Sequence, residues 1–354
     1  MPLRLWNPPV FQGRLKPRGR YFEGWYFKLV ARDRGPAVAV IPGVAWHVRP
    51  EGHRRSDPEA FVQVIDGITT RSAFVRYPID AFGFSRRRFE VRIGSNRFDL
   101  GGMDLLIDDR QIRLRGHLDF VEPVPYPVRL LSPGVMGPYS FVPFMECYHG
   151  VVSMHHDLAG SLDVAWSGEE SRTLSFHGGT GYIEKDWGRS FPSSWIWAQS
   201  NHFDGQEASF MLSVARIPWL RGHFTGFMAV LWAQGRFHTL ATYTGARLAA
   251  IRETAGRLEI EIRDRDHRLL VGTWRARHAI LRAPVEGRME RRIAESMDAT
   301  VDVSLETPQG KVLFAGRGQM GGLEIAGDLA ELCRGAGLPD PGIAQRSSVD
   351  GHNP

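Results

Sequence analysis

The sequence predicts an all-β protein built from two tandem antiparallel β-barrels or meanders, followed by a short C-terminal helix. Apolar and polar residues alternate with a period of two along most of the chain, which is typical of strands with one buried face. The 39 glycines, 22 prolines and 20 phenylalanines favour frequent turns over long helices. With 354 residues, 43% of them hydrophobic, the chain is long enough for two domains with cores of their own.

Short strands are expected wherever this alternation holds, with tight turns between them. In the N-terminal half the alternating runs are 89–93, 98–100 and 112–120. In the C-terminal half they are 226–232, 237–243, 258–262, 301–305 and 312–314. Because only a few turn residues separate neighbouring runs, the strands should pair antiparallel. The segment from Leu323 to Cys333 has helical character and is expected to close the second domain.

A weak internal sequence repeat supports the division into two domains. The stretch GRYF at 19–22 is followed by WYF at 25–27, and GRSF at 188–191 is followed by WIW at 195–197. Two domains that each open with an aromatic strand would produce this repeat. We therefore predict an N-terminal domain over 1–178, a C-terminal domain over 179–335 and a disordered tail over 336–354, where Pro, Gly, Ser and Asp are frequent.

Composition argues against several classes of protein. The net charge is +5 and the pI about 9.4, but the basic residues are almost all arginines spread along the chain, and no nucleic-acid recognition module accompanies them. The two cysteines, Cys147 and Cys333, imply no disulfide framework. No signal peptide or membrane-spanning run is apparent. These features predict a cytoplasmic protein that does not bind nucleic acid, with a basic surface compatible with transient contact with a membrane.

The stretch from Tyr182 to Asp204 combines aromatic, amide and charged residues. If 195–203 forms a strand, one of its faces carries Trp195, Trp197, Gln199, Asn201 and Phe203. Buried amides need polar partners, so this face either contains a buried polar network or lines a cavity. Aromatic walls with a few polar groups are typical of pockets for apolar ligands.

A second strand, 21–27, offers a comparable face. Glu23 would share it with Trp25 and Phe27, and a carboxyl group among aromatic side chains has a raised pKa. Such a group can hold a proton at neutral pH and act as a general acid. The alternative is that Glu23 forms an ion pair with an arginine at the sheet edge.

The residues between Tyr182 and Trp187 also admit two interpretations. Glu184, Lys185 and Asp186 could form a charge network that fixes the link between the domains. Alternatively, Glu184 or Asp186 acts as an acid or base at the mouth of a pocket, with Lys185 stabilising a carboxylate or a developing phenolate. Tyr182 and Trp187 would then contribute to the same pocket.

Histidines raise the question of a metal site. His149, His155 and His156 lie close together in sequence, but neither an HExxH motif nor facial-triad spacing accompanies them. Histidines that line a pocket or are hydrogen-bonded in the core are the favoured interpretation. We also find no GxSxG, P-loop or dinucleotide-binding motif, so the sequence implies neither a metal nor a nucleotide cofactor.

Two long stretches resemble the signature sequences of the tocopherol cyclase family. These are RYFEGWYFKLV at 20–30 and YIEKDWGRSFPSSWIWAQSNHFDG at 182–205. Residues 144–162 and 318–327 resemble other recurring stretches of the family more loosely. The resemblance implies two lipocalin-like domains, as in the related carotenoid hydratases. The plant members of the family have Asn where this chain has Asp186, which weakens the case for Asp186 as the essential acid.

The resemblance implies chemistry on a prenylated hydroquinone. The family closes a chromanol ring without a cofactor: a proton adds to the prenyl alkene, and the phenol oxygen captures the carbocation, as an intramolecular lyase of vitamin E biosynthesis does. The candidate acids are Glu23 and then Glu184, and they follow from the strand faces and not from the resemblance. Trp25, Phe27, Trp195 and Trp197 would surround the cation, and Gln199 and Asn201 would orient the quinol head. The alternatives are a hydratase of an isoprenoid alkene and a non-catalytic carrier of isoprenoid quinones.

Overall fold

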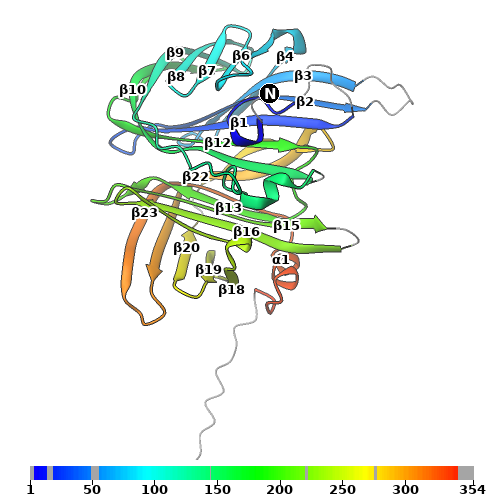
Figure 1. Ribbon diagram of the computed structural model, residues 1–354. Helices are drawn as coiled ribbons and strands as arrows, with labels where there is room; N and C mark the ends of the chain where they lie inside the picture. Colours follow the sequence, from blue (N-terminus) through cyan, green and yellow to red (C-terminus); the bar gives the residue numbers. More distant parts are fainter. Residues whose placement is uncertain are drawn as a thin grey trace, which may run out of the picture.

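The computed structural model describes residues 4–13, 19–48, 56–143, 145–219, 222–274 and 277–341. Two large antiparallel sheets lie one above the other, the first formed mainly by the N-terminal half of the chain and the second by the C-terminal half (Figure 1). This confirms the predicted all-β class. The sheets are curved, and each curls around its own apolar core.

The first sheet contains twelve strands. In spatial order they are β4 (Ser72–Pro78), β3 (Ser56–Asp66), β2 (Ala37–Val48), β1 (Tyr21–Val30), β12 (Gly179–Gly188), β10 (Cys147–Trp166), β9 (Ile112–Val121), β8 (Gly102–Asp108), β7 (Asn96–Asp99), β6 (Glu90–Ile93) and β5 (Phe82–Phe84), with β11 (Arg172–Ser175) paired to β10. Short 3-10 helices lie at η1 (Arg4–Trp6), η2 (Ile79–Ala81) and η3 (Gly137–Phe141).

The second sheet contains eleven strands. In spatial order they are β17 (Arg236–Ala241), β16 (Gly222–Ala233), β15 (Ala208–Trp219), β13 (Trp195–Ser200), β23 (Val312–Ala326), β22 (Arg288–Glu306), β20 (Arg268–Trp274), β19 (Arg257–Arg263) and β18 (Arg247–Thr254), with β14 (His202–Phe203) and β21 (Ala279–Val285) paired to β23 and β22. The 3-10 helix η4 (Thr242–Thr244) follows β17.

Both sheets follow the same path. A meander runs from the first strand to one edge of the sheet, and a 3-10 helix then connects it to the strand at the opposite edge. A second run of strands leads back until its last strand pairs with the first one: β12 with β1, and β23 with β13. Among the described residues no pairing joins β4 to β5 or β17 to β18, so neither sheet closes into a barrel. Of the two predicted forms, the meander is therefore the correct one.

The change from one sheet to the other comes later than residue 178, where the sequence places the domain boundary. Strand β12 pairs with β1 and β10 and belongs to the first sheet, and the second sheet begins at β13. At the end of β12, Gly188 has a φ of +151°, and a Cβ there would lie 2.3 Å from the Glu146 carbonyl oxygen. Glycine therefore lets the chain leave the first sheet at this point.

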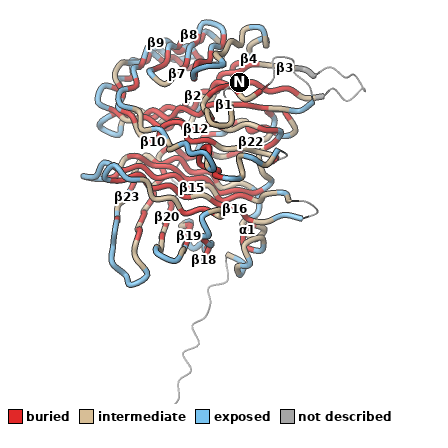
Figure 2. The backbone as a smooth tube through the Cα atoms, viewed as in Figure 1, coloured by how far each residue is buried: buried red, intermediate tan, exposed pale blue. Residues whose placement is uncertain are grey.

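Three apolar layers hold the fold together. One core lies within each sheet, and a third cluster lies between the sheets, where the outer faces of β1, β12 and β10 meet those of β13, β15 and β22. We call this cluster the inter-sheet layer. The strands that face one another there are buried along most of their length (Figure 2). Because both faces of these strands are covered, β13 is buried at all six of its residues.

The C-terminal helix α1 (Leu329–Gly335) confirms a short helix near the end of the second domain, although it begins later than Leu323. Residues 323–326 instead complete strand β23. Gly327, with a φ of +77°, ends the strand, and the Asp328 side chain caps the helix by accepting from Ala330 N. The predicted tail lies mostly outside the described residues. No helix among the described residues is long and apolar enough to cross a bilayer.

Candidate active site

A largely apolar cavity opens between the two sheets. The empty space between its walls is about 1010 Å³, which includes the open solvent at its mouth. The first sheet contributes Phe22, Tyr26, Ile41, His149, Glu184 and Asp186, and the second contributes Trp195, Trp197, Ser213, Met228, Leu281 and Glu324. The cavity therefore lies outside both cores, and most of the titratable groups on its wall come from the first sheet.

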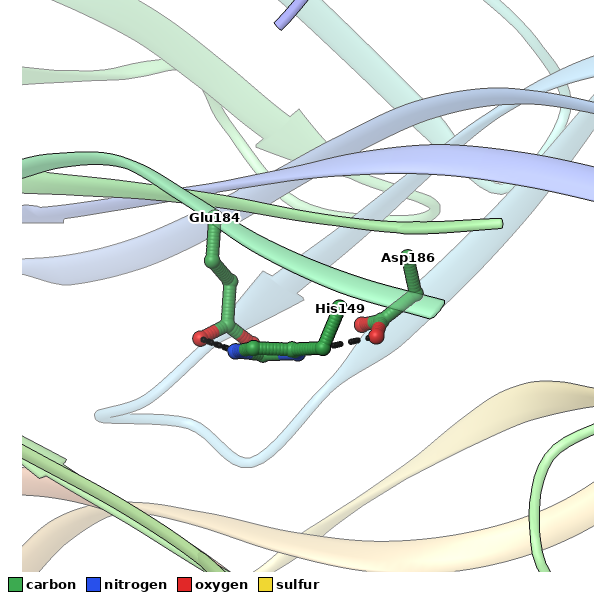
Figure 3. Close-up of side chains that lie close together, drawn as sticks. All are labelled: His149, Glu184 and Asp186. Atoms are coloured by element: carbon green, nitrogen blue, oxygen red, sulfur yellow. Dashed lines mark hydrogen bonds and ion pairs between the residues drawn. The ribbon is translucent and has the colours of Figure 1, made fainter. Parts of the chain in front are cut away.

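Strands β12 and β10 bring three titratable side chains together on this wall. Glu184 and Asp186 are two residues apart on β12 and so point to the same face. His149 lies directly opposite Asp186 in the β10–β12 register. His149 Nδ1 lies 2.9 Å from Asp186 Oδ1, and His149 Nε2 lies 3.5 Å from Glu184 Oε2 (Figure 3). The imidazole thus sits between two carboxyl groups.

Burial and the charges of the neighbouring side chains determine the protonation states of His149 and Glu184. Burial lowers the pKa of His149, but the Asp186 and Glu184 carboxylates outweigh it and raise that pKa to about 9. Burial raises the pKa of Glu184 to about 7, and Asp186 adds to the increase while His149 opposes it. At neutral pH the imidazole is therefore protonated, and the Glu184 carboxyl is close to half protonated.

The two oxygens of Glu184 have different surroundings. Oε2 accepts hydrogen bonds from the Tyr182 hydroxyl at 2.7 Å and from Trp197 Nε1 at 3.0 Å. Burial raises the pKa of Tyr182 well above its usual value, so the phenol remains a neutral donor. Oε1 accepts no hydrogen bond from any described residue. A proton on Glu184 is therefore expected on Oε1, while both donors stabilise the carboxylate once that proton leaves.

A second carboxyl group lines the cavity from the opposite sheet. Glu324, on β23, accepts a hydrogen bond from Trp195 Nε1 at 2.7 Å. Burial raises the pKa of Glu324 well above its usual value, and the nearby Glu295 and Glu184 carboxyls act in the same direction. Burial therefore favours the neutral form of the Glu324 carboxyl, which is the form that can donate a hydrogen bond into the cavity.

Glu23 lies on the other side of β1 from the cavity. Its carboxylate forms an ion pair with Lys185 at 2.6 Å, and both side chains are completely buried. The carboxylate also accepts hydrogen bonds from the backbone of Gln12 and Gly13 and from the Tyr21 hydroxyl. The partner of Glu23 is thus a lysine and not the arginine considered as the alternative. This geometry suits a structural ion pair better than an acid that meets a substrate.

Other residues that the sequence predicts for the site also lie on the core side of the first sheet, away from the cavity. Trp25 and Phe27 belong to the apolar core of the first sheet and do not line the cavity. Lys185 Nζ lies over the Trp25 and Trp187 rings and donates to the Pro8 and Val10 carbonyls. Strand alternation explains the arrangement, because Lys185 and Trp187 point away from the face that carries Glu184 and Asp186.

Of the residues predicted to share one face of a strand over 195–203, Trp195, Trp197 and Gln199 lie on β13, which ends at Ser200. Trp195 and Trp197 line the cavity, while Gln199 and Asn201 are buried beside it in a polar network. Gln199 Oε1 accepts from Lys28 Nζ at 2.9 Å, and Asn201 Nδ2 donates to the Gly181 carbonyl at 2.9 Å. Phe203 instead packs in the second core, because β13 ends at Ser200.

Sequence reasoning missed Glu324 and Tyr26 and named His149 only as a histidine of the pocket or core. Glu324 lies between Leu323 and Ile325 in an alternating run. A single carboxyl group in such a run is the sequence feature that could have indicated a site residue. This run lies at the start of the segment that the sequence predicts to be helical, Leu323 to Cys333. Tyr26 could be found from the parity of β1, since it lies on the face opposite Glu23.

His149, Glu184 and Asp186 are also the described residues whose ligand atoms lie close enough together, within 4.8 Å of one another, to hold a metal ion. The His149 nitrogens already face the two carboxyl groups, with the shorter contact at Nδ1. In such an arrangement a divalent ion would take Nε2 and Glu184, with Asp186 orienting the imidazole. It would compete directly with the proton shared by these groups.

Replacing Asp186 with Asn tests the electrostatic description of this group. Asp186→Asn removes the charge nearest to His149, so the pKa of His149 should fall from about 9 while the imidazole keeps a hydrogen-bond partner. NMR titration of the His149 ring protons measures this change. Asp302→Asn, which alters a surface pair with Arg317 in the second sheet, should leave the His149 titration unchanged. If the pKa of His149 is unchanged in Asp186→Asn, the Asp186 carboxylate does not stabilise the imidazolium, and the electrostatic description of the site is wrong.

Comparison with known proteins identifies relatives in sequence and in fold. The family profile described as "Tocopherol cyclase-like" matches residues 132–327. A probable chloroplastic tocopherol cyclase of Oryza sativa subsp. japonica is 27% identical over 92 residues, a stretch that spans 25% of this chain and only 20% of the rice protein.

Among solved structures, CghA superposes with a TM-score of 0.51 at 11% identity, covering 90% of this chain and 95% of CghA. CghA bound to Sch210972 gives a TM-score of 0.50 at 12% identity with the same coverage. These similarities show a shared fold. The profile match covers more than half of the sequence, including the strands that carry His149, Glu184, Asp186 and Glu324, and the chain therefore belongs to the tocopherol cyclase-like family.

Proposed function

We propose that the protein is a cofactor-independent cyclase that closes a chromanol-type ring on a prenylated hydroquinone. The observation that carries this proposal is the Glu184 carboxyl, which holds a proton near neutral pH on the wall of an apolar, indole-lined cavity. Membership of the tocopherol cyclase-like family supports the reaction class. The prenylated hydroquinone is the substrate class that fits the combination of an acid, aromatic walls and an apolar cavity.

Protonation of the alkene is the demanding step, and Glu184 is the proposed acid. The proton on Oε1 adds to the less substituted alkene carbon, and the Glu184 carboxylate that remains is stabilised by Tyr182 and Trp197. The protonated His149 beside it stabilises the same negative charge. These three interactions are stronger for the carboxylate than for the acid, so they lower the barrier to proton transfer.

The cation that forms is tertiary and needs a dry, electron-rich surrounding. Trp195, Trp197 and Tyr26 line the cavity and present aromatic rings to it. A desolvated cation–π contact contributes about 2 kcal/mol. Attack of the phenol oxygen on the cation forms the C–O bond, and the phenol proton restores the carboxyl group of Glu184. The product is an isomer of the substrate, and neither oxidant nor reductant is required.

Glu324 is the proposed anchor for the quinol head. As a neutral acid it donates a hydrogen bond to a quinol oxygen, while Trp195 fixes its orientation. In this proposal Glu324 takes over the role that the sequence assigns to Gln199 and Asn201, because the Gln199 amide oxygen accepts from Lys28 and the Asn201 amide donates to the Gly181 carbonyl. A non-catalytic carrier would have no need for two raised-pKa carboxyl groups on the walls of an apolar pocket, since burying them costs stability.

Activity should depend on pH through Glu184. The acid form predominates below a pH of about 7 and is lost as the pH rises through that value, so kcat/KM should reach a plateau well on the acid side and fall tenfold per pH unit on the basic side. His149 stays protonated up to a pH of about 9. A profile that holds its plateau to pH 9 would identify the imidazolium as the proton source and contradict the assignment to Glu184.

Product analysis tests the proposed function. Purified protein is incubated with geranylgeranyl- or phytyl-hydroquinone, and the products are examined by mass spectrometry and chromatography. A cyclised product with the mass of the substrate is the expected result. A product heavier by one water would indicate a hydratase, and substrate that is bound but unchanged would indicate a carrier; either result would overturn the proposal.

A further inference from the structure

Exposed apolar side chains gather in the segment that joins β9 to β10. Of the large hydrophobic residues that are well exposed in the described structure, Val128, Leu130, Leu131 and Phe141 all belong to it. Leu130 and Leu131 are each 76% exposed, more than any other large hydrophobic residue described. Adjacent exposed leucine side chains are unfavourable in water, and exposed apolar patches mark sites of interaction.

The backbone holds these two leucines at the apex of a tight turn. Arg129 and Ser132 exchange both backbone hydrogen bonds, at 2.9 and 3.1 Å, which leaves only Leu130 and Leu131 between them. Turns of this length normally carry Asn, Asp or Gly. Trp6 Nε1 donates to the Leu130 carbonyl at 3.0 Å, and the Trp6 ring packs edge-on against Phe141. These contacts hold the backbone of the turn, while the side chains of Leu130 and Leu131 stay exposed.

The same segment forms part of the cavity wall. Met136, a few residues after the turn, lines the cavity, and its sulfur accepts from His149 N at 3.1 Å. The Tyr243 hydroxyl donates to the Val135 carbonyl at 2.8 Å, which connects the segment to η4, the 3-10 helix after β17. The helix η3 that follows lies between the two sheets (Figure 1). One continuous segment therefore carries both the exposed turn and Met136 of the cavity wall, and hydrogen bonds to His149 and Tyr243 hold it in place.

We propose that the Leu130–Leu131 turn is a membrane-docking element that inserts into the interface of a lipid bilayer. A bilayer accepts two apolar side chains without requiring a complementary shape, whereas a stable protein interface needs about 800 Å² from each partner. The exposed Arg129 beside the leucines and the net charge of +5 favour anionic lipid. Delivery of an apolar substrate from the bilayer to the cavity rests on the proposed function, but docking itself does not.

Vesicle binding tests the docking element directly. Sedimentation with vesicles of phosphatidylcholine, alone or mixed with phosphatidylglycerol, is compared for the wild type and for the double variant Leu130→Ser, Leu131→Ser. The expected result is a fall in the partition coefficient of about tenfold or more, because two leucines no longer enter the interface. The control is Val312→Ser, Leu313→Ser, which alters an exposed apolar pair on β23 and should bind as the wild type does.

Two further results would overturn the inference. The first is unchanged vesicle binding by the Leu130, Leu131 variant. The second is a wild-type dimer, detected by light scattering, that the variant converts to monomers without any effect on vesicle binding, because the turn would then contact a second copy of the chain. Since partitioning is measured without substrate, absence of turnover would count against the proposed function and leave this test intact.

Discussion

Replacing Glu184 with Gln is expected to lower kcat by about a hundredfold to ten-thousandfold, the usual contribution of a general acid. The amide keeps an oxygen that can accept from Tyr182 and Trp197, so the local structure should persist. Substrate affinity should change little, because the lost proton matters mainly in the transition state. Single-turnover kinetics measures the rate, and quenching of the cavity tryptophans Trp195 and Trp197 measures binding.

The matched control is Glu290→Gln, which makes the same chemical change at an exposed position on β22 and should turn over at the wild-type rate. Glu324→Gln provides a second comparison within the cavity. Because Glu324 is proposed to orient the quinol head, its replacement should weaken binding more than it slows the chemical step. Wild-type kcat in Glu184→Gln would show that the acid lies elsewhere.

Replacing Glu23 with Gln is expected to reduce the free energy of unfolding by about 3–5 kcal/mol, because it leaves Lys185 buried without its counter-charge. Lys185→Met should have an effect of similar size, since it isolates the Glu23 carboxylate. Chemical denaturation measures both variants. The double variant Glu23→Gln, Lys185→Met should recover much of the loss, as the cost comes from the unpaired charge and not from absence of the pair.

The matched control for these variants is Glu286→Gln, which breaks the exposed pair with Arg20 and should cost less than about 1 kcal/mol. Activity per folded molecule separates structure from catalysis at Glu23. If Glu23→Gln is as stable as the wild type yet inactive, Glu23 and not Glu184 is the acid.

Local features of the fold could be predicted because they depend on neighbouring residues. Gly94 and Ser95 form the turn between β6 and β7, which begins at Asn96, and Gln234 and Gly235 form the turn between β16 and β17. Each turn is encoded by its own residues, and the alternation on either side is encoded by the strand itself. The strand direction and the all-β class follow from these short-range signals.

Long-range pairing could not be predicted in the same way. Strand β12 joins the first sheet by pairing with β1, which lies far away in sequence, and nothing in either strand specifies this partner. Strand alternation also separates two faces without saying which one borders the cavity. Glu23 and Glu184 were both carboxyls beside aromatic residues, but one points into the first core and the other into the space between the sheets.

The inter-sheet position of the cavity explains why the site combines residues from both halves of the chain. His149, Glu184 and Asp186 come from adjacent strands of the first sheet, while Trp195, Trp197 and Glu324 come from adjacent strands of the second. Trp197 Nε1 donates to Glu184 across the boundary, so the geometry of the acid depends on how the sheets pack. Each sheet alone would provide only one wall of the cavity.

The most direct test of acid catalysis in the cavity is turnover of a prenylated hydroquinone in heavy water. If Glu184 protonates the alkene, the ring-closed product should carry one non-exchangeable deuterium on carbon, next to the carbon bonded to oxygen. Glu184→Gln should form this labelled product at least about a hundredfold more slowly than the wild type. A ring-closed product without deuterium on carbon, or full labelling and turnover by Glu184→Gln, would contradict the proposed mechanism.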